Sequence, residues 1–373
     1  MPLSIFADGL PFSSRALTAC LPQEMRRACL VPNVGYSASL HRQLYADQYP
    51  DDTGVLVDWV HEREASAAVR ISAAVLSPLD IIPPLGVAAR KVLDRLLRRS
   101  VFANIPFRHR AAFSHKGSYL FRSPSLYAQL PLLRGYCVIS QDEGNRTFDE
   151  AMRLLHSAIA AGERDIFFVT GVFDALGHTC ARGDAYEQRI TPALTALGAA
   201  ISAYRAQHPH EEVLLLSDHG MSTLQERVHL HLEGVLTRRE QRRCTVYTDS
   251  CMACVFCKDR DVRQRVEAYL DTLPFGHRLD DGERAYYRVR DPRLGDELFL
   301  LREGFVFADS WFGVSWRPRP QAGEGMHGFY PEKAAVDQLA CVALLSEHRA
   351  LQTCYDYPSA HALVCAVMQG EAR

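Results

Sequence analysis

Residues 213–221 read Val-Leu-Leu-Leu-Ser-Asp-His-Gly-Met. Four consecutive apolar residues that are followed at once by polar ones are typical of a strand covered on both faces of a sheet. Asp218 and His219 then come at the carboxyl end of that strand, where ligands gather in α/β folds. The stretch therefore predicts a buried strand that delivers a carboxylate and an imidazole to a site.

Two other stretches have the same form. Leu3–Ala7 leads directly to Asp8, and Ile166–Phe173 leads to Asp174. Between these runs, apolar residues recur with a helical period over two segments, 148–162 and 186–207. Strands that alternate with helices predict an α/β fold in which a mostly parallel central sheet lies between helices. The three aspartates are then expected at one edge of that sheet.

Two stretches interrupt this alternation. Residues 60–135 are rich in Arg and Pro, and residues 240–320 are typical of a small α+β module, with strands expected at Thr245–Phe256 and Phe299–Phe307 and a helix at Val262–Leu273. The candidate ligands lie before, between and after both stretches. We therefore expect one catalytic domain over residues 1–373 that carries 60–135 as a lid-like basic insertion and 240–320 as a small α+β cap insertion.

Composition excludes some classes of protein. The net charge of −2 argues against a dedicated nucleic-acid binder, which would carry an excess of Lys and Arg. The 11 cysteines are odd in number and scattered, which favours reduced thiols over a disulfide framework. The N-terminus has neither the basic region nor the apolar region of a secretory signal, and no apolar run of about 18 residues predicts a membrane-spanning helix. We expect a cytoplasmic protein.

Three fragments carry the residue types of a metal site. They contain Asp174 and His178, Asp218 and His219, and His327, and each fragment also contains a glycine. Carboxylate oxygen together with imidazole nitrogen is the ligand set of zinc and similar first-row ions in hydrolytic sites. Asp174 and His178 are four residues apart, so they share one side of a helical turn.

The order of these fragments, together with two residues near the N-terminus, is specific. The matching set is Asp8-Gly9-Leu10, Ser37, Asp174-x-x-Gly177-His178, Ser217-Asp218-His219-Gly220-Met221 and Gly325-x-His327-Gly328-Phe329-x-Pro331. This set resembles the alkaline-phosphatase superfamily, and most of all its type I phosphodiesterase and nucleotide pyrophosphatase branch. The segment from Gly35 to Gly54 is similar to the nucleophile helix and the following turn of that branch. The resemblance covers the core from Leu3 to about residue 335.

The resemblance implies a role for each matched residue. One divalent ion would be held by Asp174, His178 and His327, and a second by Asp8, Asp218 and His219. Zinc is the expected ion at both positions, and manganese or iron would also be accepted by such ligands.

Ser37 would be the nucleophile of this site. Serine attacks poorly at neutral pH unless a base or a metal activates it, and two ions can stabilise both the attacking and the leaving oxygen. A phosphoryl- or nucleotidyl-serine would form and then be hydrolysed. A gapless match back from Tyr49-Pro50 selects Ser37 over Ser39, which remains the alternative.

Two positions depart from the pattern of the branch. Thr53 stands where the branch usually has a histidine, and Asp58 stands where it usually has an asparagine that contacts the phosphoryl oxygen. Asp58 is therefore the candidate substrate-binding residue. A carboxylate at that position would repel a phosphate dianion unless it is protonated or turned away.

These observations predict a hydrolase of phosphodiester or pyrophosphate bonds that acts on a small phosphorylated substrate, without a nucleic-acid partner. A phosphomonoesterase or phosphonate hydrolase on the same core is an alternative, and so is a non-catalytic binding protein that kept the fold. The cations of residues 60–135 have three explanations: a lid that grips the substrate, contact of residues 87–99 with a membrane surface, or ordinary solvated charge. The sequence does not indicate an oligomeric state.

Overall fold

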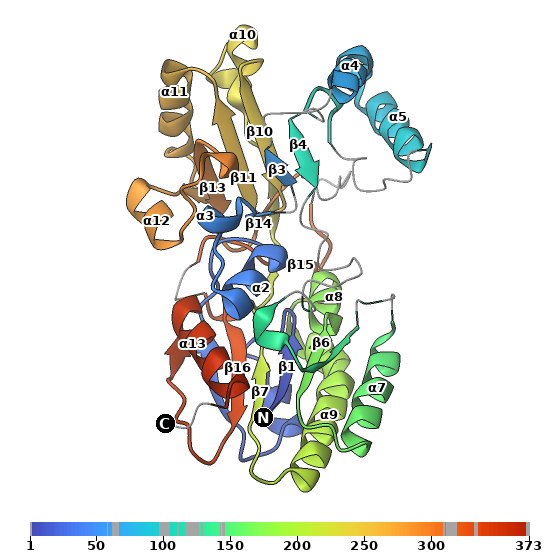
Figure 1. Cartoon of the computed structure of the whole chain (residues 1–373). Coiled ribbons are helices and arrows are strands. Elements are labelled where there is room, and N and C mark those ends of the chain that lie inside the picture. Colours follow the sequence, from blue (N-terminus) through green and yellow to red (C-terminus); the bar gives the residue numbers. More distant parts are fainter. Residues whose placement is uncertain are drawn as a thin grey trace. The chain divides into compact units, whose positions relative to one another are not determined.

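Figure 1 shows the computed structural model as a ribbon coloured along the sequence. The described residues are 2–57, 59–61, 67–96, 105–109, 112–115, 127, 130–141, 143, 146–308, 310, 319–331 and 335–370. The chain divides into two compact units: unit 1 comprises Met1–Gln48, Ser118–Leu224 and Gln321–Arg373, and unit 2 comprises Tyr49–Gly117 and Gln225–Pro320. The single catalytic domain with two insertions stays a prediction.

The central sheet of unit 1 joins seven of the described strands in the order β17-β2-β16-β7-β1-β6-β5. Their bounds are β1 (Leu3–Ala7), β2 (Arg26–Leu30), β5 (Cys137–Ser140), β6 (Ile166–Thr170), β7 (Val213–Leu216), β16 (Ala340–Leu345) and β17 (Cys354–Tyr355). Neighbouring strands run parallel, except that β16 is antiparallel to both β2 and β7. The predicted α/β fold with a mostly parallel central sheet is confirmed.

Each face of this sheet has its own apolar core, because successive strand residues point to opposite sides. In β1, Leu3 and Ile5 belong to one core, whereas Phe6 belongs to the other. In β7, Leu215 and Leu216 divide in the same way. Both sides of each strand are therefore covered, which explains why the strand sequences are continuously apolar instead of alternating with polar residues.

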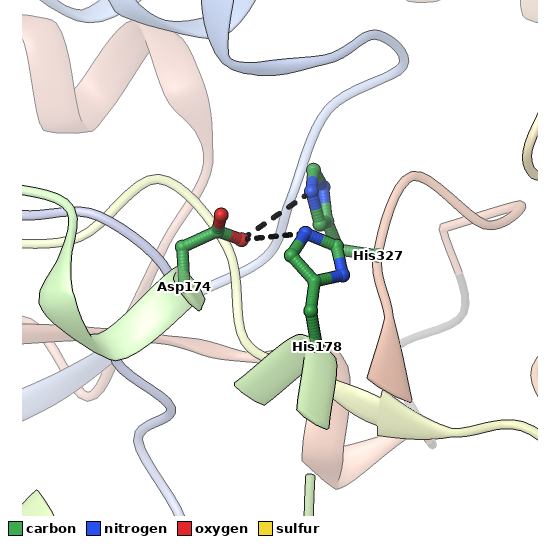
Figure 2. Close-up of side chains that lie close together, drawn as sticks. All are labelled: Asp174, His178 and His327. Carbon is green, nitrogen blue, oxygen red and sulfur yellow. Dashed lines mark ion pairs between the residues drawn. The ribbon is translucent and has the colours of Figure 1, made fainter. Parts of the chain in front are cut away.

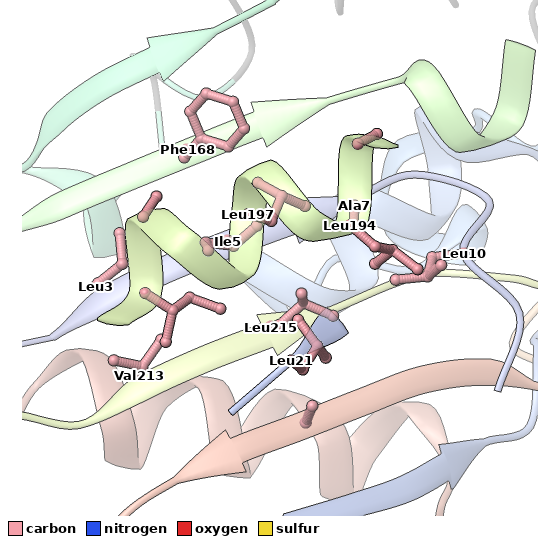
Figure 3. Close-up of a cluster of buried hydrophobic side chains, with 14 of the residues drawn as sticks. Leu3, Ile5, Ala7, Leu10, Leu21, Phe168, Leu194, Leu197, Val213 and Leu215 are labelled. Atoms are coloured by element: carbon pink, nitrogen blue, oxygen red, sulfur yellow. The ribbon is translucent and has the colours of Figure 1, made fainter. Parts of the chain in front are cut away.

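Helices supply the other half of each core. The first face is covered by α1 (Ala16–Cys20), α7 (Phe148–Ala160) and α9 (Gly183–Gln207), and the second by α2 (Ser37–Ala46) and α13 (Tyr357–Met368). Figure 3 shows Leu194 and Leu197 of α9 beside the side chains that β1 and β7 direct toward the first face. The two helical segments predicted from periodicity are confirmed as α7 and α9.

Local sequence explains where α7 begins and which side it buries. The Thr147 hydroxyl accepts the Glu150 N–H, and the Glu150 carboxylate accepts the Thr147 N–H at 2.7 Å. This reciprocal cap satisfies two N–H groups that a helix start would otherwise leave unpaired, and such a cap contributes about 1 kcal/mol. Ala151, Leu155 and Ile159 follow at four-residue spacing, so they form one buried stripe.

Unit 2 contains a four-stranded antiparallel sheet in the order β10-β11-β13-β12, together with helices, as expected of an α+β module. The elements of this module are β10 (Cys244–Asp249), β11 (Met252–Cys257), α11 (Arg260–Leu270), β12 (Gly276–Arg278), α12 (Asp281–Tyr286), η7 (Pro292–Leu294) and β13 (Glu297–Leu301). The predicted single strand over 245–256 is wrong, because a turn at Ser250, with φ of 42°, separates β10 from β11. The predicted strand over 299–307 is likewise divided into β13 and β14 (Phe305–Phe307).

The rest of unit 2 consists of short elements. Those described include α3 (Pro50–Thr53), β3 (Trp59–His61), α4 (Ala67–Leu76), η1 (Ser77–Ile81), α5 (Pro83–Leu96), β4 (Phe113–His115), β9 (Glu226–Val228) and α10 (Arg238–Gln241). Strand β3 pairs with β4, and β9 pairs with β14. Among the helices in the described part of the chain, none combines the length and apolar character that crossing a bilayer requires.

The cysteines differ in one respect from the expectation of reduced thiols. Cys29 of β2 and Cys354 of β17 are direct partners in the sheet and form a disulfide, so for this pair the expectation is wrong. The two residues are 325 positions apart, and only the register of the sheet brings them together. Cytoplasmic localisation stays a prediction.

Gly198 provides a test of the packing between α9 and α1. A Cβ atom at this position would collide with the carbonyl oxygen of Cys20. Helix propensity alone would make Gly198→Ala stabilising by about 1 kcal/mol. We predict the opposite sign, a loss of about 1–3 kcal/mol, because the collision is with main chain that cannot move aside cheaply.

Urea denaturation monitored by far-ultraviolet circular dichroism measures this effect. Ala199→Gly, at an exposed position of the same helix, is the control for helix propensity and should cost about 1 kcal/mol. A midpoint for Gly198→Ala at or above that of the wild type would contradict the packing argument.

Candidate metal centre

The carboxyl ends of three neighbouring strands bring the predicted carboxylates together. Asp8 follows β1 and Asp218 follows β7, and β1 lies between β6 and β7 in the sheet. Asp174 is in the first turn of α8 (Val172–Thr179), the helix that follows β6. His327 follows β15 (Gly325–Met326), which pairs with β8 (Ser222–Thr223) just beyond His219. All of these elements belong to unit 1.

Gly9 allows two of these loops to touch. Its φ of 72° lies in the left-handed region, and a Cβ atom would come within 2.7 Å of the Asp174 Cα. A side chain at position 9 would therefore separate the loop after β1 from α8. With glycine there, the Asp174 N–H donates to the Asp8 carbonyl at 3.0 Å. This contact holds the two aspartates side by side.

Asp174, His178 and His327 form the first group of ligating atoms. Asp174 Oδ1 lies 3.3 Å from His178 Nε2 and 3.5 Å from His327 Nε2, as Figure 2 shows. His178 is one turn beyond Asp174 on α8, so both side chains leave the same side of the helix. The ligating atoms of the three residues all lie within 4.8 Å of one another.

Asp8, Asp218 and His219 lie next to this group. His219 Nε2 is 3.4 Å from Asp8 Oδ1 and 3.4 Å from Asp218 Oδ2. Asp8 and His219 also make a compact trio with Asp174, so the two groups adjoin each other. The structure thus brings together all six residues that the resemblance selected as metal ligands.

Hydrogen bonds from the surrounding main chain orient these side chains. Nδ1 of His219 lies 2.9 Å from the Gly220 carbonyl, and Nδ1 of His178 lies 3.1 Å from the Gly325 carbonyl. Because a carbonyl can only accept, each Nδ1 donates a proton to it, which directs each Nε2 toward the facing carboxylates and leaves Nε2 as the atom that binds a ligand once it is deprotonated. Asp218 Oδ1 accepts the N–H groups of His219 and Gly9, which turns Oδ2 toward the imidazoles.

The atoms that face one another lack hydrogen-bond partners. Asp8 Oδ1, Asp174 Oδ1, Asp218 Oδ2 and His219 Nε2 are all buried in this state. Leaving buried polar atoms unpaired costs about 1–3 kcal/mol each, and more for charged groups. Divalent cations would satisfy these atoms at once, and the mixture of carboxylate and imidazole donors suits first-row ions. The residues therefore fit divalent metal ions.

Burial and crowded charge shift the acidities of the cluster. Burial, together with the nearby Asp218 carboxylate, raises the pKa of Asp8 to about 7. Burial alone would lower the pKa of His219, but the carboxylates of Asp218 and Asp8 outweigh it and raise that pKa to about 10. His327 stacks on His219 with ring centroids 3.6 Å apart, and burial and the neighbouring imidazoles hold its pKa well below the usual value.

His41 belongs to the cluster although sequence reasoning did not select it. Its Nε2 lies 3.3 Å from Asp218 Oδ2, and its Nδ1 lies 2.8 Å from the Tyr127 hydroxyl. The side chain is 2% exposed, and Asp8, His41 and Asp218 form a third compact trio of ligating atoms. His41 lies one helical turn after Ser37, but this spacing alone does not distinguish a site histidine from one that packs in a core.

Ser37 is the first residue of α2, and it is partly exposed. The preceding residue, Tyr36, has its ring 5.5 Å from the His327 ring in an edge-to-face arrangement. The alternative nucleophile, Ser39, is 1% exposed, and its hydroxyl accepts a hydrogen bond from Gln43 at 3.0 Å. Of the two serines, Ser37 has the accessible hydroxyl.

The two positions at which the sequence departs from the pattern of the branch, Thr53 and Asp58, belong to unit 2. The Thr53 hydroxyl donates to the Tyr49 carbonyl and accepts the Val55 N–H, so it closes the end of α3. Asp58, the candidate substrate-binding residue, lies outside the described residues. Its role stays a prediction.

Comparison with known proteins supports the fold. No protein-family model and no curated protein matches the chain. Murine ectonucleotide pyrophosphatase/phosphodiesterase 5, solved as an inactive variant in complex with AMP, matches with a TM-score of 0.61 at 12% identity, over 98% of this chain and 94% of that chain. The human protein of the same name matches with a TM-score of 0.62 at 10% identity, over 99% and 95%. These two structures confirm the fold that the resemblance predicted, and a shared fold does not by itself establish activity.

Metal binding can be tested on stability. We predict that Zn²⁺, Mn²⁺ or Fe²⁺ added to the metal-free protein raises its unfolding temperature, since an ion at 100 times its Kd adds about 2.7 kcal/mol. His178→Ala and His327→Ala should each reduce the rise, whereas His156→Ala, at an exposed position of α7, should not. Thermal unfolding with elemental analysis measures this. An equal rise in all variants would show that the ions bind elsewhere.

The raised pKa of Asp8 predicts that the stability of the metal-free protein depends on pH. Its pKa is about 7 in the folded protein against an ordinary value of 3.8, so between these values the folded state holds a proton that the unfolded state releases. The stability from this group is complete below pH 3.8 and is lost as the pH rises through about 7. Asp8→Asn removes this loss, so the variant should gain stability relative to the wild type between pH 5 and pH 8.

Urea denaturation midpoints, measured at pH 5 and at pH 8 in the presence of a chelator, test the direction of this pH dependence. Asp184→Asn removes an exposed carboxylate instead and should show no such gain. If Asp8→Asn lost stability relative to the wild type as the pH rose, the assigned direction for Asp8 would be wrong.

Proposed function

We propose that this protein is a dinuclear metal-dependent hydrolase of phosphate esters that cleaves phosphodiester or pyrophosphate bonds through a covalent serine intermediate. One observation carries the proposal. Three aspartates and three histidines converge, and one oxygen of each aspartate together with His219 Nε2 is buried without a hydrogen-bond partner. The helix beside them begins with a partly exposed serine. A binding protein that had lost catalysis would not need to keep all of these groups.

Asp174, His178 and His327 would hold one ion, and Asp8, Asp218 and His219 the other. When bound, the ions supply Lewis-acid stabilisation of charge on the phosphoryl oxygens and make a serine hydroxyl easier to deprotonate. Zinc is the proposed metal, because mixed carboxylate and imidazole ligands suit it; manganese and iron are the alternatives.

Ser37 performs the substitution at phosphorus. Its Oγ attacks phosphorus and loses its proton, the bond from phosphorus to the leaving oxygen breaks, and the leaving group departs with a proton as the alcohol or phosphate, so that the serine carries the phosphoryl group as an ester. Water then attacks phosphorus, which releases the product and restores the hydroxyl with its proton. Because Ser37 begins α2, the substrate phosphate would lie at the positive end of the helix dipole, where N–H groups favour an anion.

The proposed class of substrate rests on a structural neighbour. The murine structure of the same fold contains AMP, which supports a small nucleotide-like phosphate as the substrate here. The proposal does not include a nucleic-acid partner, since the net charge is −2. Parallel assays with aryl phosphate monoesters and diesters distinguish the proposed phosphodiesterase from a phosphomonoesterase.

Ser37→Ala tests the nucleophile. We predict a fall in kcat of at least about 10³-fold, the lower range for loss of a covalent nucleophile, with the metal content unchanged. Ser39→Ala is the matched control: its hydroxyl is buried and bonded to Gln43, so its removal should affect stability more than turnover. Metal removal by a chelator should abolish turnover in both the wild type and Ser39→Ala.

The combined readouts separate the possible errors. Full activity in Ser37→Ala would refute the nucleophile, and loss confined to Ser39→Ala would transfer the role to Ser39. Hydrolysis that persists in the chelated protein would refute the metal mechanism. Wild-type protein that binds metal but hydrolyses none of the phosphoesters would favour the binding-protein alternative.

A further inference from the structure

Exposed aliphatic side chains are concentrated in one hairpin of unit 2. Of the nine large hydrophobic residues that are exposed in the described part of the chain, six lie between positions 71 and 92. They are Ile71, Val75, Leu79, Ile82, Leu85 and Val92. Helices α4 and α5 and the connecting η1 therefore present an apolar surface that is unusual for a protein in water.

The spacing of these residues gives each helix an apolar side. Ile71 and Val75 are one turn apart on α4, and Leu85 and Val92 are seven positions apart on α5. Both spacings return to the same side of a helix. Val75 is 69% exposed and Val92 is 60% exposed, so these sides are not covered by other described residues.

The hairpin is folded in spite of this exposure. Arg90 of α5 makes an ion pair with Asp80 of η1, and the Arg90 side chain is only 7% exposed. A Cβ atom on Gly86 would come within 2.9 Å of the Asp80 carboxylate, so the start of α5 lies directly against η1. A charged pair buried between the two elements fixes their arrangement, and the apolar side is left facing outward.

Positive charge follows the apolar side in the sequence. Beyond the paired Arg90, residues 91–99 contain Lys91, Arg95, Arg98 and Arg99 against the single carboxylate Asp94, which gives a local charge of +3 in a chain whose net charge is −2. Aliphatic side chains that are followed in the sequence by several cations match the composition of segments that bind an anionic bilayer, where lipid chains meet charged headgroups.

The dimensions allow the helices to lie on a membrane but not to cross it. With 10 and 14 residues, α4 and α5 are about 15 and 21 Å long at 1.5 Å per residue, against a hydrocarbon core of about 30 Å. A protein partner is less well matched, because the six exposed hydrophobic residues of the hairpin include no aromatic residue of the kind that anchors protein interfaces.

We propose that the α4–η1–α5 hairpin binds the surface of an anionic phospholipid bilayer. The aliphatic sides of α4 and α5 enter the headgroup boundary, and the positive charge of the sequence around the end of α5 favours anionic over neutral headgroups. This inference is independent of the hydrolase proposal, because it concerns residues that take no part in the metal centre.

Sedimentation of the full-length protein with vesicles tests the inference. We expect binding to vesicles of phosphatidylcholine with about 30 mol % phosphatidylglycerol, weaker binding to phosphatidylcholine alone, and release as salt screens the charges. The double variant Leu85→Glu/Val92→Glu should lower the partition coefficient at least tenfold. The matched control is Leu154→Glu, which places the same charge on a residue that is 43% exposed in α7 of unit 1 and should bind like the wild type.

Three outcomes would overturn the proposal. They are failure of the wild type to sediment, equal binding by the double variant, and a wild-type dimer in light scattering that the double variant loses, since a second copy would then cover the hairpin. Circular dichroism and hydrolysis of a soluble diester verify that the variants are folded. Because these controls do not involve lipid, failure of membrane binding is distinguishable from failure of the proposed catalysis.

Discussion

The Asp218 carboxylate connects the elements on which the metal centre depends. Its Oδ1 accepts N–H groups from Gly9, in the loop after β1, and from His219. Its Oδ2 faces His41 of α2 at 3.3 Å, and its main-chain carbonyl accepts the Tyr357 hydroxyl of α13 at 2.7 Å. A charge with no exposed surface is costly unless it is paired and hydrogen-bonded. The strand ends and both helices are thus held in place by the need to satisfy one buried anion.

The same requirement explains why the cluster is prepared for cations. Burial alone would raise the pKa of Asp218, but the charges of His219 and His41 outweigh burial and hold it well below the ordinary value. Burial raises the pKa of the nearby Asp8, and the negative charge of Asp218 raises it further. Without metal, the repulsion between these two adjacent carboxylates is smallest when Asp8 holds a proton. Added positive charge relieves that repulsion, so the folded chain favours cations before any ligand arrives.

The parts of this structure that local sequence determines were predictable. Strands buried on both faces have continuous apolar sequences, and their carboxyl ends are marked by aspartates, so both the sheet and the convergence of Asp8, Asp174 and Asp218 could be anticipated. The hairpin between β10 and β11 could not, because its turn uses Ser250 at positive φ where glycine or asparagine would have been the signal. The Cys29–Cys354 disulfide depends on the register of strands far apart in sequence.

His41 was missed for a related reason, since a histidine among the apolar residues of a helix cannot be distinguished by sequence from one that merely packs in a core. Once His41 is known to face Asp218, however, it fixes the rotation of α2 about its axis. Ser37 precedes His41 by four residues and therefore lies on the same side of the helix, at the end where Tyr36 meets His327. Ser39 lies about 200° around the helix from Ser37, and its hydroxyl is bonded to Gln43. The contact that sequence reasoning overlooked thus gives independent geometric support for Ser37 as the residue that faces the metal centre.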